Sequence, residues 1–329
     1  MEIIDGYSRK TIDLLRESTQ RGIRMDREFL AELNGIRKKF SGALPAEYVY
    51  EKMLLRKQHG VAAISTGVCW WDEWAGPFRR ANLYCLAGYQ GSGKTTLAVA
   101  LTWQMALKGV KVWNVCLELT AEEMFEVVGG HVLGKASLTS EDFATAYATI
   151  QGTGYRFFEA ERDVNWKENL ERICDTVRKD KIDMVVIDNF SYLTSVERNS
   201  YETERVAAKA LKSLAQELEI PILCIAHLRK PDRDDSEPNP TAHSVLGSGA
   251  LTQAASDTFI LHHPLAGDSE SNSRHPVGYI LSGKPRWTVG GKRYVRYLGW
   301  RRAFSEATAE QYRRQFPDKG KSPERKYKL

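Results

Sequence analysis

One short segment limits what this chain can fold into more than any other. Residues 88–95 read Gly-Tyr-Gln-Gly-Ser-Gly-Lys-Thr, which matches the P-loop pattern G-x-x-x-x-G-K-[ST]. Its glycines let backbone N–H groups turn toward phosphate oxygens, in conformations that a Cβ would obstruct. Lys94 supplies a positive charge to the β- and γ-phosphates, and the hydroxyl of Thr95 can bind Mg²⁺. The segment therefore predicts a site for ATP with Mg²⁺.

The neighbours of this loop fit the same interpretation. Residues 83–87 form an apolar run suited to a buried strand, and residues 96–107 have the pattern of a helix whose N-terminus would face the phosphates. An unrelated glycine-rich turn would not require this strand–loop–helix order. The residues expected to contact the nucleotide here are Gly88, Gly91, Ser92, Gly93, Lys94, Thr95 and Thr96.

Composition excludes several classes of protein. Of 329 residues 42% are hydrophobic, so the chain can bury a sizeable core and is not a disordered protein. It has no run of about 18 apolar residues, and its first residues carry acids where a signal peptide would be basic. We therefore expect a cytoplasmic protein without a membrane partner, in a bacterial or phage-infected cell, with an organellar matrix as the alternative. The five cysteines occur singly, which favours free thiols, and the net charge of +5 permits nucleic-acid binding without requiring it.

The two ends of the chain differ from its middle. Residues 1–60 have helical spacing at 11–17, 26–40 and 46–58, but too little apolar material for an independent core, so we expect a small helical arm or linker. Residues 306–329 are expected to form a basic flexible tail, because positions 313–329 carry seven Lys or Arg against two acids, together with two prolines.

Between these ends, residues 61–305 alternate predicted strands and helices. This pattern predicts an α/β fold with a mostly parallel sheet covered by helices, followed by a C-terminal β-hairpin over residues 278–282 and 294–298. The other expected strands are residues 83–87, 110–117, 155–158, 182–187, 221–226 and 256–261, and the expected helices are 96–107, one from 121, 140–149, 166–178 and 204–218.

Polar side chains follow three of these strands, where ligands bind in a parallel sheet. Asp188 ends an apolar strand and is predicted to hold Mg²⁺. Glu118 could orient an attacking water, although a glutamate at this place also suits a helix start. His227 could be structural or functional. His262 and His263 are not expected to form a metal pair, because adjacent strand residues point to opposite faces.

These features occur in the order found in one family. The P-loop, Leu117-Glu118-Leu119, Asp188-Asn189, His227, the segment Leu-Gly-Ser-Gly-Ala-Leu-Thr-Gln at 246–253, and Lys284-Pro-Arg286 together resemble a DnaB-type hexameric helicase with a RecA-like core. The chain is most similar to the Twinkle and bacteriophage primase–helicase branch, over about residues 65–304. The resemblance implies an ATP-dependent DNA helicase of the replicative type, which moves on single-stranded DNA as a homo-hexamer with ATP sites between subunits.

The resemblance also implies roles for single residues. Glu118 would be the general base, His227 a sensor of the γ-phosphate, and Arg286 an arginine finger for the neighbouring subunit, with Lys284 beside it. Gln253 would belong to the nucleotide site. Loops 189–203 and 229–248 would face DNA. Their candidate DNA-binding residues are Arg198, Arg229, Lys230 and Arg233.

Several alternatives stay open from the sequence. A RecA-type recombinase or recombination mediator would need a polymerisation strand in the N-terminal arm, and no such strand is seen in the sequence. A KaiC-like regulatory ATPase remains an alternative, because the acidic residues at 232–237 are unfavourable for binding DNA. The ring could also be a heptamer or a filament. Only the short arm precedes the core, so we expect a separate primase, polymerase or loader as partner, in phage, plasmid or prophage replication.

Overall fold

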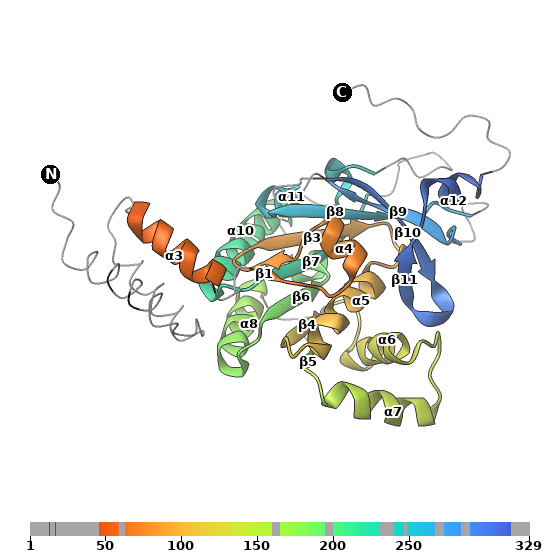
Figure 1. Cartoon of the computed structure of the whole chain (residues 1–329), viewed down its shortest axis with the longest axis horizontal. Coiled ribbons are helices and arrows are strands. Elements are labelled where there is room, and N and C mark those ends of the chain that lie inside the picture. The colour runs from red at the N-terminus through yellow and green to blue at the C-terminus, as the bar shows by residue number, and fades with distance from the viewer. Residues whose placement is uncertain are drawn as a thin grey trace, which may run out of the picture.

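The apolar runs of the middle segment form a nine-stranded sheet within the described part of the computed structural model (Figure 1). The structure describes Asp13, Glu17 and residues 46–58, 63–159, 165–194, 200–229, 240–246, 249–266, 273–283 and 290–316. The strand order is β11-β10-β9-β8-β3-β7-β6-β4-β5. These strands are β3 (Leu83–Gly88), β4 (Val112–Cys116), β5 (Tyr155–Glu159), β6 (Met184–Asp188), β7 (Ile222–His227), β8 (Asp257–His262), β9 (Val277–Ser282), β10 (Gly291–Leu298) and β11 (Ala303–Glu306).

The six strands from β8 to β5 run parallel, and β9, β10 and β11 continue the sheet antiparallel to their neighbours. Register brings the strand ends together. Gly88 of β3 pairs with His227 of β7, and Cys116 of β4 pairs with Asp188 of β6. We call this side of the sheet its carboxyl edge, since the parallel strands end there. Two further short strands, β1 (Ala63–Ile64) and β2 (Phe78–Arg79), form a separate antiparallel pair.

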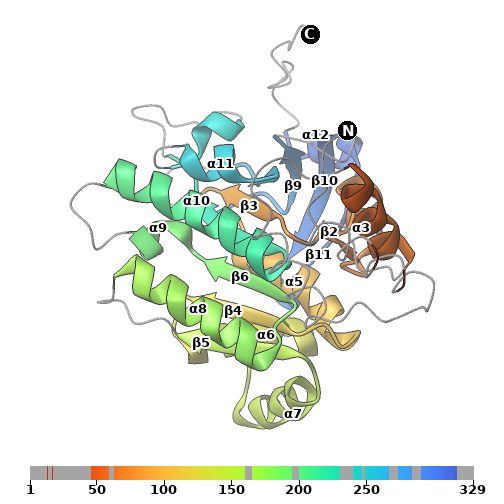
Figure 2. The ribbon, with the colours of Figure 1, turned by 90° about the vertical axis from the view of Figure 1, so that its left-hand side faces the viewer.

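Helices cover both faces of the sheet. One face carries α8, α9, α10 and α11, of which α8 and α10 lie side by side (Figure 2), and the other carries α4, α5, α6 and α7. Their bounds are α4 (Cys69–Trp74), α5 (Lys94–Leu107), α6 (Ala121–Leu133), α7 (Ser140–Gln151), α8 (Trp166–Asp180), α9 (Phe190–Thr194), α10 (Ser200–Leu218) and α11 (Ala250–Ala254). A short 3₁₀ turn, η1 (Ala242–Ser244), precedes α11, and another, η2 (Gly299–Arg301), joins β10 to β11.

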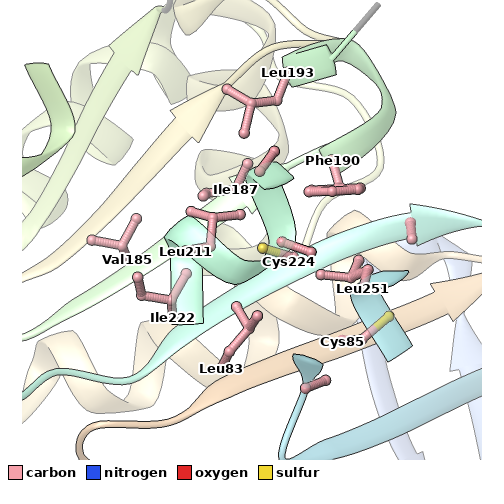
Figure 3. Close-up of a cluster of buried hydrophobic side chains, with 14 of the residues drawn as sticks. Leu83, Cys85, Val185, Ile187, Phe190, Leu193, Leu211, Ile222, Cys224 and Leu251 are labelled. Atoms are coloured by element: carbon pink, nitrogen blue, oxygen red, sulfur yellow. The ribbon is translucent and has the colours of Figure 1, made fainter. Parts of the chain in front are cut away.

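Strand alternation explains why the core has two halves. Leu83 and Cys85 of β3 face the cluster under α8 and α10, whereas Tyr84 and Leu86 face the cluster under α5. Figure 3 shows the first cluster, in which side chains from β3, β6 and β7 meet those of α9, α10 and α11. Because both of their faces are buried, the inner strands β3, β6 and β7 are apolar up to their carboxyl ends, and this is why they could be predicted from the sequence. The predicted α/β fold is confirmed.

The C-terminal part differs from its prediction in two ways. The expected hairpin is present as β9 and β10, but β9 joins the main sheet through β8, and β11 adds a further strand. The prediction of a flexible tail from residue 306 was wrong for residues 306–316. Helix α12 (Ala309–Arg313) begins with a capping box, and the Gln315 side chain exchanges two hydrogen bonds with the backbone of Val277, each 2.9 Å long. Residues 317–329 lie outside the described residues.

The arm is described at its last helix, α3 (Ala46–Gln58), which has the predicted bounds. Lys52 Nζ lies 3.1 Å from Glu219 Oε1, and the Tyr48 side chain is buried. Helix α3 therefore packs on the core of its own chain, near the end of α10. The helices predicted at 11–17 and 26–40 lie outside the described residues, apart from Asp13 and Glu17, which are helical. Among the helices that the structure describes, none is long and apolar enough to cross a membrane.

Candidate active site

The P-loop leaves β3 at Gly88 and enters α5 at Lys94. Gly93, the residue before the helix, has φ of 88°, a conformation that side chains rarely adopt. Gly88 is needed for a different reason, because a Cβ there would lie 2.5 Å from Ser92 Oγ and 2.7 Å from the carbonyl oxygen of Leu261. The loop thus curls tightly over its strand. Its backbone N–H groups and the N-terminus of α5 can then face a phosphate.

Lys94 is held beneath this loop. Its residue exposure is 6%, and Nζ donates a hydrogen bond of 3.0 Å to the carbonyl oxygen of Tyr89. Burial lowers the pKa of Lys94 to about 8, while the carboxylates of Asp188 and Glu118 act in the opposite direction and Arg274 lowers it further. A buried ammonium group with one carbonyl acceptor is well prepared to bind a phosphate oxygen.

Thr95 and Asp188 form the part of the site that fits a divalent cation. Thr95 Oγ1 donates a hydrogen bond of 2.6 Å to Asp188 Oδ2. The other oxygen, Asp188 Oδ1, is buried and has no hydrogen-bond partner among the described residues. Burial raises the pKa of Asp188 to about 6, against the lowering effect of the Thr95 hydrogen bond. Hard oxygen ligands with one orphaned carboxylate oxygen are what Mg²⁺ requires, so the residues present fit this ion.

Glu118, Asn189 and His227 form a polar trio beside Thr95 and Asp188. Asn189 Nδ2 lies 2.5 Å from Glu118 Oε2 and 2.9 Å from His227 Nε2, and the last two atoms are 3.3 Å apart. The hydrogen bond from His227 is the main cause that lowers the pKa of Glu118, helped by Asn189 and the charge of Lys94 and opposed by burial. Glu118 is therefore an ionised, partly exposed carboxylate that can hold a water molecule.

Register explains how distant residues meet in this trio. The carbonyl oxygen of Asp188 accepts hydrogen bonds from Leu117 N, at 2.8 Å, and Glu118 N, at 3.1 Å, so the chain after β4 is fixed against the end of β6. Helix α6 then starts at a capping box between Thr120 and Glu123. Glu118 is therefore not the helix cap, which was the alternative left open by its sequence position, and its carboxylate faces the site.

Two residues near the site were given no role by sequence reasoning. Asn189 follows Asp188 directly, and this position at a strand end was the signal that could have found it. Arg274 has no motif around it, yet its guanidinium donates to the carbonyl oxygen of Gln90 at 2.8 and 3.2 Å and to that of His263 at 2.7 Å. It also lies over the ring of Tyr89. Arg274 therefore braces the P-loop from the segment between β8 and β9.

The other predicted residues divide into two groups. Thr96 lies in the first turn of α5, Gln253 is exposed on α11, and Arg229 is exposed after β7. Their assigned roles stay predictions. The residues Arg198, Lys230, Arg233, Lys284 and Arg286 lie outside the described residues. His262 and His263 are buried, and their rings pack against Tyr89 and Tyr279 and against Tyr297 and Phe304, respectively.

Comparison with solved structures supports the fold. One solved ATPase domain matches 82% of this chain with all of its own length, at a TM-score of 0.63 and 16% identity. A DnaB-like replicative helicase, solved in a study of its interactions with primase, covers 92% of this chain with 77% of its length, at a TM-score of 0.59 and 18% identity. A KaiC-like protein from Pyrococcus horikoshii covers 75% of this chain with 99% of its length, at a TM-score of 0.54 and 18% identity. At such identities the likeness concerns the fold alone.

Comparison of sequences identifies the family. The replicative DNA helicase DnaB of Geobacillus stearothermophilus is 22% identical over 327 residues, which cover 92% of this chain and 71% of the relative. A probable plasmid replicative DNA helicase of Chlamydia trachomatis is 24% identical over 212 residues, covering 60% of this chain and 46% of the relative. Residues 63–305 match the model of the DnaB-like helicase C terminal domain. This match spans most of the chain and includes every strand of the main sheet except the last residue of β11. The chain therefore belongs to the DnaB-like helicases, the ATP-hydrolysing helicases of the replicative type.

Proposed function

We propose that this chain is the motor of a ring-shaped DNA helicase, which hydrolyses ATP with Mg²⁺ at its subunit interfaces and moves along single-stranded DNA. One observation carries the proposal. The P-loop, Asp188, the Glu118 carboxylate and His227 meet at a single edge of the sheet, so phosphate binding, metal binding and water activation would share one site. The family match adds the helicase context.

The residues of this site have separable tasks. The P-loop N–H groups and Lys94 would bind the phosphates, and Thr95 and Asp188 would hold Mg²⁺, which supplies charge stabilisation for the transferred phosphoryl group. Glu118, held at Oε2 by Asn189, would orient the attacking water and accept its proton. His227, which contacts Glu118 directly, would respond to the presence of the γ-phosphate.

The point at which the chain leaves β9 supports a finger that acts on a neighbouring subunit. Gly283 N donates to the carbonyl oxygen of Thr258, near the start of β8, so the chain leaves the sheet far from its carboxyl edge. Lys284 and Arg286 follow directly in the sequence. We infer that Arg286 serves the phosphates of an adjacent copy, with Lys284 beside it, and that hydrolysis therefore depends on assembly into a ring.

Backbone contacts connect the sensor to a segment proposed to face DNA. The carbonyl oxygen of His227 accepts a hydrogen bond of 2.8 Å from Leu246 N, Leu228 forms a β-bridge with Val245, and Arg229 N donates to Ser244 O at 2.9 Å. A displacement of His227 would thus move residues 244–246 directly. We propose that single-stranded DNA contacts this segment and the loop after Asp188, with Arg198, Arg229, Lys230 and Arg233 as phosphate ligands. A separate primase, polymerase or loader would complete the replication machinery.

The experiment that tests this proposal mixes two inactive variants. Arg286→Ala removes the finger and Glu118→Gln removes the base, and each variant alone is expected to bind ATP but to hydrolyse it at least about 100-fold more slowly than wild type. If the finger acts in trans, mixed rings contain some interfaces where an intact Glu118 meets an intact Arg286, and DNA-stimulated hydrolysis returns. Mixing Arg286→Ala with the double variant should restore nothing. No recovery in the first mixture would refute the shared site, and DNA-indifferent hydrolysis would favour a regulatory ATPase.

A further inference from the structure

The Asn189 side chain lies at the centre of the hydrolytic site but has no part in the roles described so far. It is completely buried, whereas Glu118 and His227 are partly exposed. Its Oδ1 accepts hydrogen bonds from Ser191 N at 3.0 Å and from Tyr192 N at 3.3 Å, in the first turn of α9. Its Nδ2 faces Glu118 and His227.

These contacts permit only one orientation of the amide. Two backbone N–H groups require an acceptor, so the oxygen must face α9 and the amide nitrogen must face the carboxylate. The nitrogen has two hydrogens, one for Glu118 and one directed toward His227. The amide therefore links α9 on one side to Glu118 and His227 on the other, through a group that cannot rotate without losing contacts at both ends.

The distances indicate that Asn189, rather than His227, fixes the carboxylate. The contact from Asn189 Nδ2 to Glu118 Oε2 is 2.5 Å, whereas that from His227 Nε2 is 3.3 Å. His227 Nε2 can donate to Glu118 or accept from Asn189, but not both, because a single ring nitrogen cannot do both at once. Glu118 keeps its bond from Asn189 in either arrangement, so the base stays in place while the sensor changes partner.

We propose that Asn189 is a positioning residue, which holds Glu118 for water activation and transmits the position of α9 to it. This inference rests on the proposed function, in which the chain after Asp188 faces DNA. Tyr192 of α9 is 47% exposed and its backbone is bonded to Asn189, so a ligand that displaces α9 would displace the amide and with it the carboxylate. DNA binding would thereby alter the rate of hydrolysis.

Two substitutions separate this role from simple capping of a helix. Asn189→Asp keeps an oxygen for α9 but removes both donated hydrogens, and Asn189→Ser keeps a short N-cap hydroxyl but cannot reach Glu118. If the amide only caps α9, both variants should hydrolyse ATP normally. If it positions Glu118, both should bind ATP within about threefold of wild type while kcat falls about 100-fold, the loss that misplacement of a catalytic group by about 1 Å can cause.

The experiment measures kcat and KM of both variants, with and without single-stranded DNA, together with nucleotide binding and thermal melting. Asn114→Ser is the matched control, since Asn114 is a buried asparagine of the neighbouring strand β4 outside the site, and it should keep kcat and DNA stimulation. Combining Asn189→Ser with Glu118→Gln should cost no more than Glu118→Gln alone, because both act through one carboxylate.

The outcomes distinguish this inference from the proposed function. Wild-type kcat and DNA stimulation in folded Asn189→Ser and Asn189→Asp would overturn the inference and leave the helicase proposal intact. An additive loss in the double variant would also overturn it. If wild type itself hydrolyses ATP without any response to DNA, the proposed function fails, together with the DNA-transmission part of the inference. Lower kcat in the two variants would then still support the positioning of Glu118.

Discussion

Replacing Asp188 by asparagine tests the site without any substrate. In the nucleotide-free protein, burial raises the pKa of Asp188 from its ordinary 3.8 to about 6. The folded state therefore binds this proton more tightly than the unfolded chain. The proton on Asp188 therefore adds to the free energy of unfolding, fully below pH 3.8, and this contribution is lost as the pH rises through 6. About two pKa units at about 1.4 kcal/mol each correspond to about 3 kcal/mol of lost stability at pH 8.

Asparagine removes this pH-dependent cost and keeps an oxygen that can accept from Thr95. Its amide nitrogen would replace Oδ1, which has no hydrogen-bond partner among the described residues, and burying an unpaired donor there costs about 1 kcal/mol or more. We therefore expect the free energy of unfolding of Asp188→Asn to be about 1–2 kcal/mol higher than that of wild type at pH 8, and this difference to be smaller by about 1.4 kcal/mol at pH 5. The same variant should lose hydrolysis, because the proposed Mg²⁺ ligand is gone.

Urea unfolding in the presence of a chelator, at pH 5 and pH 8, measures both free energies. Asp175→Asn is the control, since it makes the same substitution at an exposed position on α8. Magnesium with a nonhydrolysable ATP analogue should stabilise wild type and not the variant. The reasoning would be refuted if Asp188→Asn were no more stable than wild type at pH 8, or if the difference were the same at both pH values.

Three further predictions follow from other contacts. Glu118→Gln should lower kcat by about 10²–10⁴-fold with ATP affinity unchanged in a binding titration, whereas Glu122→Gln, on the exposed start of α6, should behave as wild type. Arg274→Ala should raise KM for ATP by about tenfold, because the P-loop loses two charge-assisted hydrogen bonds. Arg274→Lys should bring KM part of the way back to the wild-type value. An unchanged KM in Arg274→Ala would mean that Arg274 does not support the P-loop. Lys52→Ala leaves the buried Glu219 carboxylate without this ion pair, so limited proteolysis should cut between α3 and the core faster, while Lys52→Arg should resist.

The sheet and the P-loop could be predicted because their signals are local. Strands buried on both faces, such as β3 and β6, are apolar throughout, and the P-loop motif fixes its own strand and helix. Asp188, Glu118 and His227 could be singled out because they follow such strands, and the carboxyl ends of parallel strands share one edge.

What could not be predicted depends on contacts between distant segments. Arg274 returns to the P-loop across 184 positions of the chain, which no spacing rule anticipates. The role of Asn189 depends on the direction of its amide, which is set by the first turn of α9. Strand β11 and helix α12 were hidden by charged and polar residues, although the capping box of Thr308 and Gln311 was a readable helix signal.

The central claim is that this chain forms a motor with ATP sites shared between subunits. The most direct test is the steady-state rate of ATP hydrolysis per subunit, measured against protein concentration with and without single-stranded DNA. A shared site predicts a rate per subunit that rises with concentration as rings assemble, and that increases further when DNA is added. A rate that is independent of both concentration and DNA would contradict the account.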